Sequence, residues 1–100
     1  MIDHAPGLDL EMSVELSAGE DGTVSVGHSV NISETGMLVF SQDPRPRGTV
    51  IHFVVGPRFK GSGEVIWTRN ADAGGAFLGL RFRPLPRGAR KTLLGLLQAG

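Results

Sequence analysis

The sequence predicts a small, mainly β domain in which six antiparallel strands form a barrel or a sandwich, followed by one short C-terminal helix. Two observations predict this fold class. Apolar and polar residues alternate along most of the 100-residue chain, and a period of two is typical of strands with one buried face. Glycine and proline interrupt the alternation at regular intervals, and closing or doubling the sheet removes the exposed edges of so many short strands.

The first two strands are expected at residues 8–16 and 24–32. Residues 8–16 read Leu-Asp-Leu-Glu-Met-Ser-Val-Glu-Leu, where every second residue is apolar, so the whole stretch is expected to be one strand. A turn is expected over residues 18–22, which would join the two strands in a hairpin. Gly36 then opens a third strand at residues 37–40.

The rest of the sheet follows a loop over residues 43–48, where two prolines remove backbone donors and a glycine frees the chain. In the strand expected at residues 59–69, Gly61 and Gly63 indicate a bulge or a place where another backbone comes close. Three further strands are expected, at residues 49–55, 59–69 and 77–83.

Residues 87–98 are expected to form a helix over one end of the barrel. Leu93, Leu94, Leu96 and Leu97 fall at helical spacing, and cations occupy the other side. The alternative is a helix that lies on a membrane surface. The segment is short and Gly95 weakens it, so core packing is the preferred interpretation and no membrane insertion is expected.

Composition limits the class of protein further. Length predicts one domain, and the longest apolar runs are too short to cross a bilayer. The absence of cysteine excludes disulfides and thiolate metal sites and fits a cytoplasmic location. His4, His28 and His52 fall on separate elements without ligand spacing, so neither a metal site nor an enzyme is expected. Trp67 and the phenylalanines are expected in the core, so no nucleic acid polymer is expected as a partner.

Charge is balanced over the whole chain but divided between its halves. Residues 1–50 hold eight acids and two arginines, and residues 51–100 hold eight cations and two acids. If the halves interleave in one sheet, these charges become cross-strand pairs. The alternative is a basic surface for an anionic ligand or an acidic protein.

One short motif carries a functional signal. In Asn31-Ile32-Ser33-Glu34-Thr35-Gly36 a strand ends on an amide, a hydroxyl follows two residues later, and Gly36 allows a left-handed turn. Taken alone, this spacing is a common turn.

The motif resembles the (Asp/Asn)-x-Ser-x-x-Gly signature of PilZ domains, bacterial β-barrels that receive the second messenger cyclic di-GMP. The resemblance covers residues 8–98, which are expected to form a PilZ-like β-barrel domain with a C-terminal helix at residues 87–98. Residues 1–7 are expected to be an N-terminal segment before this domain. It implies a six-stranded antiparallel barrel. The further segments that carry it are Pro46-Arg47-Gly48-Thr49-Val50, Gly63-Glu64-Val65-Ile66-Trp67 and Gly79-Leu80-Arg81-Phe82.

One departure from the family pattern concerns the ligand. PilZ receptors carry an Arg-x-x-x-Arg motif before the first strand, and its guanidiniums hold the phosphates and guanine edges. The counterpart here, residues 3–7, reads Asp-His-Ala-Pro-Gly and has no arginine. Losing two charge-assisted hydrogen-bonding groups should cost roughly 3 kcal/mol, about a hundredfold in affinity.

The expected function is therefore a PilZ-like signalling adaptor that acts on another protein of a motility or surface-behaviour system, with ordinary cyclic di-GMP binding weakened or lost. Asn31, Ser33 and Gly36 are the expected residual ligand-binding residues. The alternative is a cyclic di-GMP receptor that uses other cations. Arg45, Arg47 and Arg81 are the first candidates for these anion contacts, followed by Arg58, Lys60 and Arg69. No other cofactor is expected.

Overall fold

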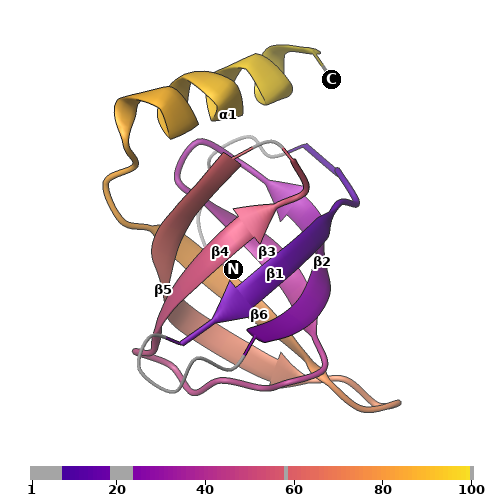
Figure 1. The fold of residues 1–100 in the computed structure, drawn as a ribbon. Helices are drawn as coiled ribbons and strands as arrows, with labels where there is room; N and C mark the ends of the chain where they lie inside the picture. Colours follow the sequence, from indigo (N-terminus) through magenta and orange to yellow (C-terminus); the bar gives the residue numbers. More distant parts are fainter. Residues whose placement is uncertain (1–7, 19–23, 58, 100) are drawn as a thin grey trace.

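The computed structural model describes residues 8–18, 24–57 and 59–99, and it is a closed antiparallel barrel with a C-terminal helix (Figure 1). The strands follow one another around the barrel in the order β1-β2-β3-β6-β5-β4. The elements are β1 (Ser13–Ser17), β2 (Val24–Ile32), β3 (Gly36–Ser41), β4 (Val50–Val55), β5 (Phe59–Asn70), β6 (Ala76–Phe82) and α1 (Arg87–Ala99).

The predicted fold class is confirmed, and the barrel is chosen over the sandwich. Strand β1 pairs with β2 on one side and with β4 on the other, so the sheet has no free edge there. The first two strands pair antiparallel as predicted, and the turn predicted between them lies outside the described residues except for Ala18. Helix α1 lies over one end of the barrel (Figure 1), and no helix in the described part of the chain could span a membrane.

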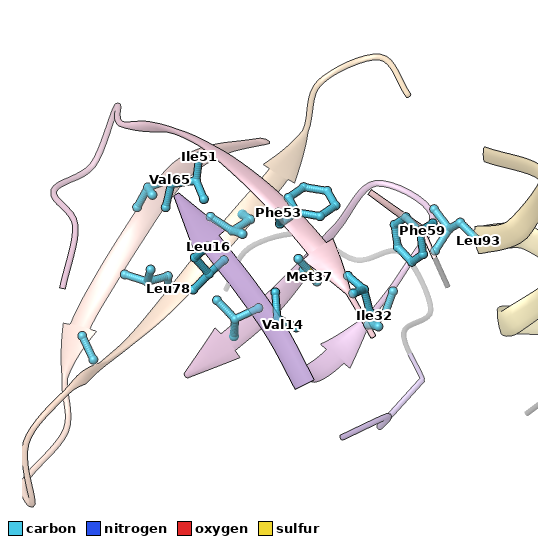
Figure 2. Packing of buried hydrophobic residues seen from close by; sticks show 14 residues of the cluster. Val14, Leu16, Ile32, Met37, Ile51, Phe53, Phe59, Val65, Leu78 and Leu93 are labelled. Carbon is cyan, nitrogen blue, oxygen red and sulfur yellow. The ribbon is translucent and has the colours of Figure 1, made fainter. Parts of the chain in front are cut away.

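The alternation of the sequence becomes the inside and outside of the barrel. In β4, Ile51, Phe53 and Val55 are buried, while the residues between them are exposed. Fourteen buried apolar residues form one cluster, shown in Figure 2. Leu93 belongs to this cluster and is fully buried, so it fastens α1 to the barrel end. Burying a leucine side chain contributes about 2 kcal/mol, which helps to keep this short helix in place.

The first strand is shorter than expected, because β1 begins at Ser13 rather than at residue 8. Leu8 pairs with Ile32 and Ser13 pairs with His28. The five residue steps from Leu8 to Ser13 therefore lie opposite only four steps in β2, which leaves a gap in the pairing. The side chain of buried Ser29 enters this gap. Its hydroxyl accepts a hydrogen bond from the Met12 amide at 3.0 Å and donates one to the Leu10 carbonyl. The Ser29 hydroxyl therefore supplies part of the pairing that a continuous strand would make, beside the backbone bond from the Ser29 amide to the Met12 carbonyl.

The bulge predicted at the two glycines of β5 lies elsewhere. The register with β6 shifts between Val65 and Trp67, two residues beyond Gly63. Gly63 instead marks a close approach, the other expectation, because a Cβ there would stand 2.8 Å from the Arg81 carbonyl oxygen. A similar shift in β2 lies between Ser29 and Asn31, directly before the signature turn.

Phe40, Phe77 and Trp67 lie outside the buried core cluster, contrary to the expectation. Phe40 and Phe77 are half-buried on neighbouring strands, with ring centroids 5.3 Å apart. The row continues to His28, stacked on Phe40 at 5.4 Å, and to Arg69, whose guanidinium carbon lies 6.0 Å from the Phe77 centroid. These contacts follow the strand register, so one outer face of the barrel carries an aromatic row.

The expected charge pairing between the halves of the chain is wrong for the described residues. The Arg45 guanidinium lies 2.8 Å from the Asp43 carboxylate, and His28 lies 3.7 Å from Glu11. Both contacts fall within the first half of the chain. Within the described ranges no ion pair joins the second-half cations to an acid, although Glu64 lies opposite Arg81 in the pairing of β5 with β6.

Candidate functional site

The turn between β2 and β3 is built around the Ser33 hydroxyl, which is 4% exposed. The Ser33 amide donates to the Gly36 carbonyl at 2.8 Å. The hydroxyl in turn accepts from the amides of Thr35 and Gly36, both at 3.3 Å. These bonds satisfy the backbone of the turn internally, so Ser33 shapes the turn and is largely covered.

Gly36 has a different role from the one expected. Among the described residues, glycine φ angles are positive only at Gly48, Gly56, Gly74 and Gly75, so Gly36 is not left-handed. It is buried and pairs with Arg81 of β6. A Cβ at this position would collide with the Leu80 carbonyl oxygen. Glycine is required because the backbones of β3 and β6 come together here.

Asn31 stands at the end of β2 with its amide already engaged. The Asn31 amide nitrogen donates to the Asp9 carboxylate at 2.9 Å. Sequence reasoning did not single out Asp9. The contact follows from the pairing of Leu8 with Ile32, which places Asp9 beside Asn31 and which the sequence alone does not reveal.

The surface around Asn31 is acidic. Asp9 and Glu11 line a shallow cleft of about 460 Å³ together with His28. The Glu11 side chain is 79% exposed, whereas Glu34 of the adjoining turn lines a separate cleft. Several carboxylates at one surface repel phosphate groups through their summed field. The field of Asp9 and Glu11 therefore disfavours an anion in this cleft.

The structure separates the three arginines predicted as anion contacts. Arg81 pairs with Gly36 and lies beside the signature turn. Arg45 and Arg47 lie in the loop after β3, at the end of the barrel opposite α1 (Figure 1). Six residues of β3 span roughly 17 Å, at about 3.3 Å per residue, so these two are remote from the turn. Arg45 is also held by Asp43.

The other predicted groups are not brought to the turn. Lys60 and Arg69 are exposed on β5, and Arg69 lies over Phe77. Arg58 and the counterpart of the arginine motif, residues 3–7, lie outside the described residues. Among the described residues there is no group of three potential metal ligands.

Two arginines that sequence reasoning did not select lie beside the turn. Arg83 and Arg90 line a cleft of about 350 Å³ together with Arg81, Glu34 and Thr35. The signal that could have found them is the charge of the C-terminal quarter. Residues 73–100 contain five cations, Arg81, Arg83, Arg87, Arg90 and Lys91, and no acid.

Comparison with known proteins gives a family and a fold. Residues 7–99 match the family model described as PilZ domain. A structure of the Bacillus subtilis inhibitor of motility (MotI/DgrA) is similar, with a TM-score of 0.78 and 17% sequence identity. The similarity covers 97% of this chain and 50% of the chain of that structure, so this chain spans about half of its length. No curated protein matches the sequence.

Proposed function

Because the chain belongs to the PilZ domain family, we propose that it is a signalling adaptor that acts by contact with another protein and binds cyclic di-GMP weakly or not at all. The process that we propose is control of motility or surface behaviour. The similar fold of an inhibitor of motility supports this choice of process. The proposal assigns the chain a binding role and no catalytic step.

The bond between Asn31 and Asp9 carries the proposal. In the family signature the first position presents a polar side chain to the ligand, but here its amide donates to an internal carboxylate at 2.9 Å. A ligand at Asn31 competes with this bond for one amide hydrogen and meets a neighbouring negative charge. Ser33 and Gly36 remain because they build the turn, a role that does not depend on a nucleotide.

The sequence before the barrel supports the same conclusion. Residues 3–7, where the family carries its arginine pair, contain no arginine and include Asp3. Guanidinium groups hold phosphates by paired, charge-assisted hydrogen bonds, and neutral or acidic side chains do not replace them. Weakening of roughly 3 kcal/mol or more, about a hundredfold, follows from the loss of the pair.

A second candidate function is a cyclic di-GMP receptor with a different set of arginines. The observation in its favour is that Arg81 lies next to the turn, in one cleft with Arg83 and Arg90. Arg45 and Arg47 do not support this candidate, because their loop lies at the other end of the barrel.

Isothermal titration of the purified protein with cyclic di-GMP, at low and at moderate salt, separates the two functions. The adaptor predicts no saturable heat at high ligand concentration. Saturable binding that the Arg81→Ala substitution abolishes would establish the receptor instead. Charge reversal of both Arg45 and Arg47 is the matched control, and it should leave any measured affinity unchanged.

The partner is sought separately, by pull-down from a lysate of the source bacterium followed by mass spectrometry. The adaptor predicts recovery of a specific motility or signalling protein. Recovery of no protein at all, together with saturable nucleotide binding, contradicts the adaptor function.

A further inference from the structure

The cleft beside the signature turn is lined by three arginines. We call it the arginine cleft, and its walls are Arg81 at the end of β6, Arg83 in the linker, and Arg90 on α1. Phe82 and Leu85 supply apolar surface, and Glu34 also lines the cleft. Its volume of about 350 Å³ falls within the range of real binding clefts.

The three arginines are exposed and make no ion pair within the part of the chain that the structure describes. Three neighbouring guanidiniums repel one another. Glu34 lines the cleft with them and Glu64 lies opposite Arg81 in the pairing of β5 with β6, so the three cations outnumber the two acids. Arg45, by contrast, is neutralised by Asp43 at 2.8 Å. The arginine cleft therefore holds positive charge that an external anion would neutralise.

The start of α1 adds to this field. Backbone amides at the beginning of a helix carry a partial positive charge, and proteins usually place acids there. The first turn of α1 has no acid, and both Arg87 and Arg90 are exposed in it. This arrangement disfavours the helix on its own and becomes favourable when an anion is bound nearby.

The spacing of the arginines points to the shape of the anion. The Arg83 amide donates to the Ser62 carbonyl at 2.9 Å, so the backbone remains extended beyond the end of β6. Arg81 and Arg83 therefore lie two residues apart on an extended chain, roughly 6.6 Å. Alternate side chains of an extended acidic segment have the same spacing, and intervening apolar side chains could contact Leu85.

We propose that the arginine cleft docks an extended acidic segment of the partner protein, with alternate carboxylates on Arg81 and Arg83 and a further one at Arg90. Glu34 in the cleft favours such a segment over a compact phosphate, because a peptide can place an amide or a cation beside it. This inference rests on the proposed adaptor function and names the chemistry of its partner.

Nuclear magnetic resonance of the labelled full chain tests the inference, with acetylated hexaglutamate as the probe. The expected result is saturable shifts of the Arg81, Arg83 and Arg90 side-chain signals, decreasing as salt is raised. Arg83→Glu should weaken binding about fivefold or more, since reversing a contacting charge removes about 1 kcal/mol. Arg47→Glu, the same change in an exposed residue at the other end, should alter it less than about twofold.

Two results would overturn the inference. Equal weakening by Arg83→Glu and Arg47→Glu would mean that only net charge attracts the peptide. Inorganic pyrophosphate that saturates the same arginine signals and displaces hexaglutamate would make the cleft a phosphate site. Cyclic di-GMP is titrated into the same samples. Tight nucleotide binding refutes the adaptor function, whereas absent peptide binding without nucleotide binding refutes only the acidic docking segment.

Discussion

The Asn31 amide nitrogen lies 2.9 Å from the Asp9 carboxylate, so the leading residue of the family signature is engaged by a residue of the same chain. The two residues are 22 positions apart and meet because Leu8 pairs with Ile32. The bond joins the segment before β1 to the signature turn. It also places a negative charge where the family is expected to receive an anion.

Replacing Asp9 by asparagine should strengthen any residual cyclic di-GMP binding. The substitution removes one exposed like charge, worth about 0.2–1 kcal/mol, so the gain should be roughly one- to fivefold. Nuclear magnetic resonance titration can follow such weak binding. Asp72→Asn is the control, because it removes an exposed acid from the turn between β5 and β6. Equal gains in both variants would disprove a local effect of Asp9.

Gly36→Ala should destabilise the barrel by roughly 1–3 kcal/mol, because its Cβ would collide with the Leu80 carbonyl oxygen and force β3 away from β6. Urea unfolding measures the change. Gly95→Ala is the matched control, since that helical glycine has open space around its Cβ position. Alanine there should stabilise by about 0.5–1 kcal/mol. An unchanged unfolding midpoint for Gly36→Ala would show that the strands can separate at little cost.

Ser29→Ala should release the segment before β1. Alanine leaves the Met12 amide and the Leu10 carbonyl without their hydroxyl partner, at a cost of about 1–3 kcal/mol. Hydrogen exchange should accelerate at the Met12 and Leu8 amides. Ser17→Ala is the control, because the Ser17 hydroxyl makes no hydrogen bond within the described ranges. Exchange that stays slow at Met12 would mean that the backbone holds this segment without Ser29.

Leu93→Ala should loosen α1 from the barrel. Leu93 is fully buried among core residues, and truncating a buried leucine costs about 2–5 kcal/mol. Chemical denaturation gives the stability, and circular dichroism should show reduced helix content. Lys91→Ala, an exposed change two residues earlier, should alter stability by less than about 0.5 kcal/mol. A similar loss in both variants would indicate that helix propensity, not the Leu93 contact, holds α1.

Much of the fold could be predicted because it depends on local patterns. Six strands and a helix follow from alternation, turn residues and the leucine spacing, and their bounds differ from the structure mainly at their ends. The first strand is the largest difference. Its alternation continues to Leu8, but the Ser29 side chain comes from another strand, and the pattern of one strand contains no information about that intrusion.

The candidate site was predicted in part. Asn31, Ser33 and Gly36 were identified by their spacing, and Arg81 was chosen among several cations. The engagement of Asn31 by Asp9 and the gathering of Arg83 and Arg90 beside Arg81 depend on segments distant along the chain. The remoteness of Arg45 and Arg47 depends on which end of the barrel their loop closes.

The sequence by itself determined where the chain is extended, where it turns and which side of each strand is apolar, because these properties depend on neighbours along the chain. Only the tertiary structure decided why Gly36 must be glycine and which charges meet. Both depend on strand register. The Leu80 carbonyl opposite Gly36 and the Asp9 carboxylate beside Asn31 are brought there by pairing across the closed barrel.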